Sequence, residues 1–137
     1  LSGTVRTFTI EKMQEIEQQM VSISEGISKA HGGTALVEFN TLFLPVFNEE
    51  RATDLATEVC GDIVGQDNVI TTGSAGTGSE DFSFMSNEVP GCYVIIGNGE
   101  DSNALHNPNF DFNDEALVYG GSFFARVIEK ELALDQV

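Results

Sequence analysis

Residues 10–33 read IEKMQEIEQQMVSISEGISKAHGG, and this stretch determines the expected fold of the first third of the chain. Its apolar side chains recur every three or four positions, as on one face of an amphipathic helix. They are Ile10, Met13, Ile16, Met20, Ile23 and Ile27. A glycine pair such as Gly32-Gly33 is common just after a helix C-terminus. The sequence therefore predicts a helix that begins at Ile10 and ends before Gly32.

Segments with the composition of β-strands lie on both sides of this helix. Residues 1–9 alternate apolar and polar side chains and contain several β-branched threonines. Residues 34–44 are rich in Val, Leu and Phe, and Pro45 closes them. A strand, helix, strand connection normally places both strands in one sheet with the helix on one face. We therefore expect an α/β fold that starts with a strand-helix-strand unit.

The middle of the chain predicts two helices separated by a glycine-rich loop. Asn48 or Thr53 is suited to cap the first helix, because their side chains accept hydrogen bonds from helix N-terminal amides. Residues 71–79, TTGSAGTGS, form the polar loop, and Ser79 is suited to cap the helix that follows. The composition changes near Pro45, which marks the expected domain boundary.

The last part of the chain predicts a strand and a long helix. Residues 92–96, CYVII, are a continuous apolar run typical of a buried strand. After a loop, Asn113 or Asp114 is suited to cap a helix from about residue 115 to residue 134. The glycine pair at 120–121 costs helix stability, which predicts close packing against a sheet.

Charge limits the partners that the chain is expected to bind. It carries 22 acidic and 6 basic residues, a formal net charge of −16. Such a surface repels phosphates, so we expect neither nucleic acid nor an anionic membrane as a partner. No apolar run is long enough to span a membrane, and residues 1–8 lack the basic start of a signal peptide. The acidity indicates either a highly soluble surface or attraction of divalent cations, and composition favours the first.

Cysteine and glycine patterns indicate no redox pair and no phosphate loop. Cys60 and Cys92 lack CxxC spacing, and we expect buried thiols in a cytoplasmic protein. The glycines of 71–79 resemble a phosphate loop in spacing alone. Glu80 and Asp81 follow them, and these acids would place negative charge where a phosphate would lie.

Two residues have both a structural and a functional interpretation. His106 lies in a loop after the predicted strand, where α/β proteins place ligands, but one histidine cannot make a metal site. A role in hydrogen bonding is the alternative. Arg6 forms either a surface ion pair with one of many acids or a bidentate clamp on a substrate carboxylate. His31 needs no function, because a cation favours a helix C-terminus.

Four segments occur in an order that resembles one enzyme family. They are Gly3–Phe8, Pro45 with Asn48, Gly78–Ser83 and Leu105–Glu115. They resemble the metal-dependent amidohydrolases and carboxypeptidases that include hippurate hydrolases, N-acyl-amino-acid amidohydrolases and auxin-conjugate hydrolases. The resemblance is to the C-terminal portion of such an enzyme. It implies half of a small α+β lid or dimerisation domain in residues 1–47, and the C-terminal part of a helix-flanked catalytic-domain sheet in residues 48–137.

The resemblance also implies roles for individual residues. In similar enzymes the histidine of the Leu-His-Asn-Pro motif binds one of two divalent ions (Zn, Mn, Co or Ni), which points to His106 as a metal ligand. A lid arginine binds the substrate carboxylate, which points to Arg6. Glu80 and Asp81 match a segment beside the active site and are expected to be structural. The general base and the other ligands would lie upstream, so we expect no catalytic residue in this chain.

The implied activity is cleavage of the amide bond of an N-acyl amino acid, or a related small conjugate, by metal-activated water. The chain alone is expected to be inactive without the missing N-terminal portion of the enzyme. A homodimer formed through the lid domain is also expected. The alternative is a non-catalytic α/β module for interaction or dimerisation.

Overall fold

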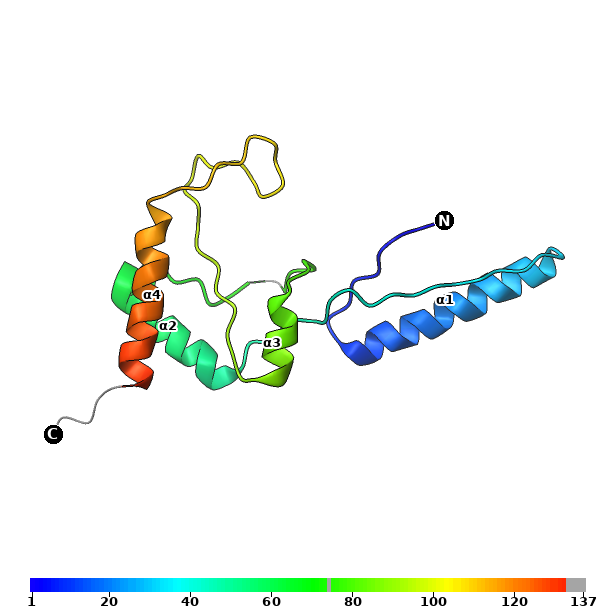
Figure 1. The fold of residues 1–137 in the computed structure, drawn as a ribbon, viewed down its shortest axis with the longest axis horizontal. Coiled ribbons are helices and arrows are strands. Elements are labelled where there is room, and N and C mark those ends of the chain that lie inside the picture. The colour runs from blue at the N-terminus through cyan, green and yellow to red at the C-terminus, as the bar shows by residue number, and fades with distance from the viewer. Residues whose placement is uncertain (74, 133–137) are drawn as a thin grey trace. The chain divides into compact units, whose positions relative to one another are not determined.

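The computed structural model describes residues 1–73 and 75–132. Its helices are α1 (Ile10–Ala30), α2 (Glu50–Val64), the short 3₁₀ helix η1 (Gln66–Asn68), α3 (Phe82–Glu88) and α4 (Ala116–Glu131) (Figure 1). The chain divides into two compact units: Leu1–Phe47 with Ser74–Val89, and Asn48–Gly73 with Pro90–Val137. None of the described helices is both long enough and apolar enough to cross a membrane.

The predicted α/β fold is wrong for residues 1–73 and 75–132, which contain helices and turns but no β-strand. The three predicted strands (1–9, 34–44 and 92–96) and the predicted helix-flanked sheet are therefore not formed in this part of the chain. A strand requires a neighbouring strand with which it exchanges ladder hydrogen bonds. β-Propensity reports how side chains fit a pleated, half-buried surface, and it cannot supply that neighbour.

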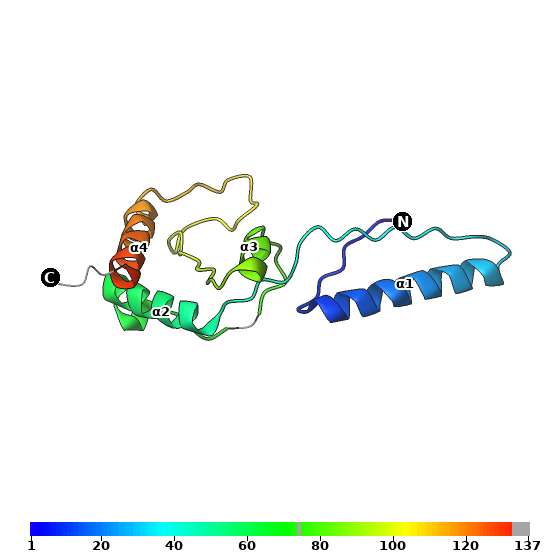
Figure 2. The same ribbon diagram turned by 60° about the horizontal axis from the view of Figure 1, so that its bottom comes forward.

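In the first unit, the segment that follows α1 runs back along the helix (Figures 1 and 2). Ala35, Val37 and Phe39 are half-buried, whereas the residues between them are exposed. The Thr41 hydroxyl donates to the Met13 sulfur at 3.7 Å. The alternating pattern that predicted a strand is therefore realised as an extended chain beside a helix.

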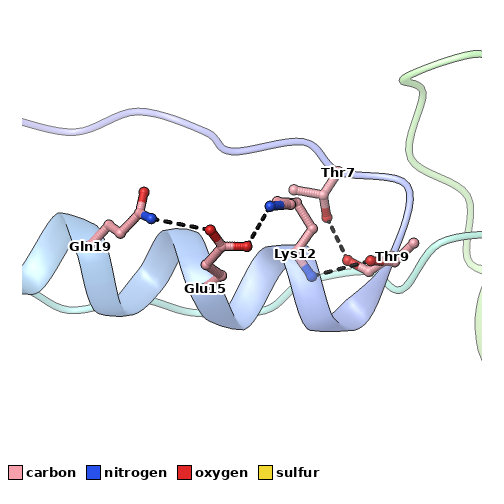
Figure 3. A network of polar contacts seen from close by, with 5 residues as sticks. All are labelled: Thr7, Thr9, Lys12, Glu15 and Gln19. Carbon is pink, nitrogen blue, oxygen red and sulfur yellow. Dashed lines mark hydrogen bonds and ion pairs between the residues drawn. The ribbon is translucent and has the colours of Figure 1, made fainter.

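Helix α1 begins at Ile10, as its apolar spacing predicts. Thr9 caps it, because the Thr9 hydroxyl accepts a hydrogen bond from the backbone N–H of Lys12 at 3.1 Å. The Lys12 ammonium pairs with Glu15, and Gln19 donates to the same carboxylate at 3.2 Å (Figure 3). The hydrogen bond and charge of Lys12 lower the pKa of Glu15. At the other end, Gly32 has a φ of 74°, which suits glycine.

The apolar stripe of α1 is only partly covered in the first unit. No residue of the helix is fully buried. Ile23 and Ile27 are 60% and 59% exposed, and Leu36 on the returning segment is 87% exposed. This face therefore retains exposed apolar surface. Burying that surface against a neighbouring element would lower the free energy.

Helix α3 is fixed to the first unit through Ser83, which is fully buried. Its hydroxyl accepts a hydrogen bond from the backbone N–H of Leu44 at 3.3 Å. The Asn87 side chain, also on α3, donates to the Pro45 carbonyl at 3.4 Å. The rings of Phe43 and Phe84 lie 6.4 Å apart. These contacts attach α3 to the residues around Leu44.

In the second unit, α2 packs against α4. The buried apolar side chains are Ala56, Val59 and Ala116, and Val59 is fully buried. Lys130 of α4 pairs with two acids of α2, Glu58 at 2.6 Å and Asp62 at 2.8 Å. The Lys130 hydrogen bond lowers the pKa of Asp62. A small apolar contact and a charged rim therefore hold the two helices together.

The N-terminus of α2 differs from the prediction, because Glu49 caps it rather than Asn48 or Thr53. The Glu49 carboxylate accepts hydrogen bonds from the backbone N–H groups of Arg51 at 3.1 Å and Ala52 at 2.8 Å. These two bonds, that of Ala52 foremost, lower the pKa of Glu49.

Asn48 instead joins the start of α2 to the predicted strand at 92–96. Its side-chain amide donates to the Tyr93 carbonyl at 3.1 Å and accepts from the Tyr93 N–H at 2.9 Å. The backbone N–H of Glu49 donates to the Gly91 carbonyl at 2.9 Å. One side chain thus makes both bonds that a neighbouring strand would make.

Helix α4 begins at Ala116, one position after the predicted start. The Asn113 side chain accepts from the backbone N–H of Glu115 at 3.0 Å, just before the helix. The predicted end at Leu134 lies outside the described residues. A Cβ on Gly120 would lie 3.4 Å from Cδ1 of Ile96, so the predicted close packing occurs here against an extended segment.

We expect Val59→Ala to lower the free energy of unfolding by about 2 kcal/mol, because buried methyl groups are lost and a cavity remains. Val118→Ala on α4 is the matched control. Val118 is 70% exposed, so its substitution should change stability by less than about 0.5 kcal/mol. Urea denaturation followed by circular dichroism measures both. Equal effects would show that Val59 does not form the α2–α4 core.

Glu49→Ala should lower the melting temperature at pH 7 more than at acidic pH. The pKa of Glu49 is lowered by folding, so the stabilisation is complete above the ordinary glutamate value of about 4.3. It is lost as the pH falls through the lower pKa of the folded state. Thermal melts between pH 7 and pH 3 measure the difference, with Glu50→Ala in the same helical turn as the control. A difference from wild type that is constant with pH would contradict the charged cap.

Candidate functional site

Residues 97–113 form a loop whose two ends are joined by one side chain, that of Asn98. The Asn98 carbonyl oxygen accepts from the backbone N–H of Asn113 at 2.8 Å. Its amide nitrogen donates to the Asp111 carbonyl at 2.7 Å and to the Ser102 hydroxyl at 2.6 Å. Asn98 is half-buried. The loop is therefore closed at its base, next to α4.

A second side-chain amide crosses the same loop closer to its tip. The amide nitrogen of Asn103 donates to the Asn109 carbonyl at 3.0 Å. Between them, the backbone N–H of Asn107 donates to the Ala104 carbonyl at 3.1 Å, which closes a four-residue turn. His106 is the third residue of this turn.

The backbone of His106 is strained. Its φ is 66°, and among residues 1–73 and 75–132 it is the one non-glycine residue with a positive φ. This conformation costs an ordinary side chain roughly 1–2 kcal/mol. Such strain persists where the surroundings impose it, and it is concentrated at functional sites. The His106 side chain itself is exposed to solvent.

His106 fits a metal site as a single ligand. Imidazole nitrogen is an ordinary ligand of zinc and of the neighbouring transition metals. In the part of the chain that the structure describes, no three His, Cys, Asp or Glu residues are grouped so that they could hold an ion. His106 therefore offers one nitrogen ligand, and the described residues provide no group of three candidate ligands that would complete a site.

Arg6 is bound by the glycine-rich loop. Its Nη1 donates to the Thr77 carbonyl at 2.7 Å and to the Ser79 hydroxyl at 2.8 Å. Ser79 is therefore not the helix cap that the sequence predicts, and Asp81 occupies the cap position of α3 without a side-chain cap hydrogen bond. Neither acceptor of Arg6 carries a formal charge. Arg6 belongs to the first unit and His106 to the second.

Glu80 and Asp81 lie at the beginning of α3. The Glu80 carboxylate accepts from the backbone N–H of Phe82 at 3.4 Å. The pKa of Asp81 is raised, first by its hydrogen bond with the Glu80 carboxyl and then by the negative charge of Glu80. The two acids therefore interact with each other at the start of α3.

The two cysteines are unpaired thiols in the second unit. Both are half-buried, so the expectation of fully buried thiols is only partly met. Burial, and then the charge of Cys92, raise the pKa of the Cys60 thiol. A raised pKa disfavours the reactive thiolate, which is consistent with a structural thiol.

A family model decides where this chain belongs. The model of peptidase family M20/M25/M40 matches residues 8–130. The chain belongs to this family. The match includes His106 and the glycine-rich loop, and Arg6 lies just before it.

Several curated proteins resemble this M20/M25/M40 chain. N-acetylcysteine deacetylase of Bacillus subtilis is 30% identical over 93% of the chain and 32% of its own length. IAA-amino acid hydrolase ILR1-like 4 of Arabidopsis thaliana is 26% identical over 96% and 32%. Hippurate hydrolase of Campylobacter jejuni is 28% identical over 94% and 33%. The chain thus spans about a third of the length of these relatives. No solved structure matches it.

Two features of this M20/M25/M40 chain were not found from its sequence. The first is the pair of amides, Asn98 and Asn103, that cross the loop around His106. Their signal was an asparagine-rich segment, which composition alone assigns to a loop. The second is the contact of Arg6 with Thr77 and Ser79, which lie more than seventy positions away. No local pattern predicts such a pair.

We expect His106→Gly to be more stable than His106→Ala by about 1 kcal/mol, because glycine adopts a positive φ without steric cost. At Leu105, whose φ is not positive, the order should reverse and alanine should be more stable. Denaturant unfolding of the four variants measures this. If alanine equals or exceeds glycine at position 106, the His106 backbone is not strained in the folded protein.

Proposed function

We propose that this chain belongs to an amidohydrolase that cleaves the amide bond of N-acyl amino acids or related small conjugates, using two divalent ions. The observation that carries the proposal is the family match over residues 8–130. Its relatives include enzymes named for N-acetylcysteine, hippurate and IAA-amino acids. These names share a small acylated amino acid, or an amino acid conjugate, as the substrate class.

His106 would bind one of the two ions (Zn, Mn, Co or Ni). When bound, such ions supply the Lewis acidity that activates water for attack on an amide carbonyl. His106 contributes an imidazole nitrogen on a loop whose backbone is held by hydrogen bonds. The remaining ligands and the general base would come from outside the described residues, in an N-terminal portion of the enzyme.

Arg6 would bind the substrate carboxylate. Its two hydrogen bonds to the glycine-rich loop use Nη1 alone, and Nε and Nη2 carry three more N–H donors. The edge formed by Nε and Nη2 matches the spacing of carboxylate oxygens. Arg6 makes no ion pair with a described residue, and its two acceptors are neutral. Its charge is therefore not neutralised by a described acid and remains available to an anionic group.

Residues 1–47 would form the second half of a lid domain that also pairs two copies of the enzyme, and residues 48–137 the end of the catalytic domain. The apolar side chains of Ile23, Ile27 and Leu36 are exposed. This exposure supports the proposal that another part of the enzyme or a second copy covers this face. The same exposure favours the second candidate function, a non-catalytic interaction or dimerisation module.

His106→Ala in the full-length enzyme should lower Mn²⁺- or Zn²⁺-dependent hydrolysis of hippurate and other N-acyl amino acids by more than about 100-fold. Changes outside the ligand shell alone typically cost 10–100-fold in metal affinity or activity. His31→Ala is the matched control and should retain activity. Full activity of His106→Ala would remove His106 from the site. No activity in either the wild type or the variants would favour the interaction module.

Arg6→Ala should lower kcat/KM for N-acyl amino acids by about 100-fold, because a charged pair with the substrate is lost. The loss should be much smaller for a substrate whose carboxylate is replaced by a carboxamide. Arg126→Ala removes an exposed arginine of α4 and should leave both substrates unaffected. Equal losses for both substrates would show that Arg6 does not bind the carboxylate.

A further inference from the structure

Two nested side-chain contacts surround His106. Asn98 links the base of the loop across 15 positions, to the backbone N–H of Asn113. Asn103 links the loop closer to its tip across 6 positions, to the carbonyl of Asn109. His106 lies inside both contacts.

We propose that Asn98 and Asn103 are positioning residues for His106: their cross-loop hydrogen bonds impose the strained backbone that aims the imidazole. The inference rests on the proposed function of His106 as a metal ligand. Neither asparagine is itself assigned to the metal or to the substrate.

A loop as long as residues 97–113 is flexible unless contacts across it restrict its conformations. Closing a flexible loop costs conformational entropy, and each side-chain contact across it reduces the number of conformations that remain. Asn98 makes three hydrogen bonds of 2.6–2.8 Å, to Ser102, Asp111 and Asn113. An asparagine amide is well suited to this, because it has two donors and an acceptor at one site.

The positive φ of His106 shows that the loop is constrained rather than relaxed. An unconstrained loop would move an ordinary residue out of this conformation, because it costs roughly 1–2 kcal/mol. The apolar side chain next to His106, Leu105, is 72% exposed, so packing does not hold the turn in place. The turn itself is closed by the backbone bond from Asn107 to Ala104, and the side chains of Asn98 and Asn103 fix the loop on either side of it.

The test combines two measurements on the full protein with Asn98→Ala, Asn103→Ala and the milder Asn98→Asp, which keeps the acceptor for Asn113. The first is the NMR order parameter of the His106 backbone amide without metal. It should fall from about 0.85 to below about 0.6 in both alanine variants. The second is the Zn²⁺ dissociation constant by chelator competition, which should rise about 10- to 100-fold.

Asn68→Ala is the matched control. The Asn68 side chain also donates one short hydrogen bond, to the Val64 carbonyl at 2.7 Å, but lies outside the loop. Asn68→Ala should change neither the His106 order parameter nor the Zn²⁺ dissociation constant. Asn98→Asp should give an intermediate effect, and circular dichroism verifies that each variant keeps its helices.

The outcomes separate this inference from the proposed function. An unchanged His106 order parameter in Asn98→Ala and Asn103→Ala overturns the inference, whatever the metal does. A looser loop with unchanged Zn²⁺ affinity also overturns it, provided that His106→Ala weakens binding. If His106→Ala itself leaves Zn²⁺ affinity unchanged, the proposed function fails, and the order parameter alone decides whether the asparagines hold His106.

Discussion

Backbone hydrogen bonding is the constraint on which the rest of this structure depends. A helix satisfies most of its N–H and C=O groups within itself, whereas an extended segment needs a neighbour to do so. The described residues accordingly form helices, and their extended segments lie beside helices or are held by side chains. The residues from Thr34 onward run back along α1, and residues 92–96 are held by Asn48.

At two positions, a side-chain amide bonds backbone groups that a neighbouring strand would otherwise bond. Asn48 bonds both backbone groups of Tyr93, and Asn98 bonds the backbone of Asp111 and Asn113. An amide can do this because it carries donors and an acceptor in one plane. A loop can thus be ordered without an apolar core beneath it. This accounts for a strained residue such as His106 in a segment that is largely exposed.

The sequence predicts the helices of this fold well, and several of their caps and all long-range contacts poorly. The start of α1 at Ile10 follows from a 3.6-residue period that is visible within one or two turns. The strands failed because a ladder needs a partner that no local pattern reveals. Ser79 is not the cap because α3 begins at Phe82 with Asp81 at the cap position, and its hydroxyl accepts from the distant Arg6 instead. His106 could be singled out by its motif, but its backbone strain depends on contacts across the loop.

Arg6 differs from the other basic residues of the chain in the groups that it binds. The chain carries only 6 basic residues against 22 acidic ones. Four of the basic side chains, on α1, α2 and α4, form ion pairs with acids. Lys29 lies in the last turn of α1, where the helix dipole favours a cation. Arg6 differs from all of them, because its guanidinium is held by a carbonyl and a hydroxyl. Among the basic side chains that the structure describes, Arg6 is the one that donates to neutral oxygens only, and the proposal that it binds a substrate carboxylate rests on this difference.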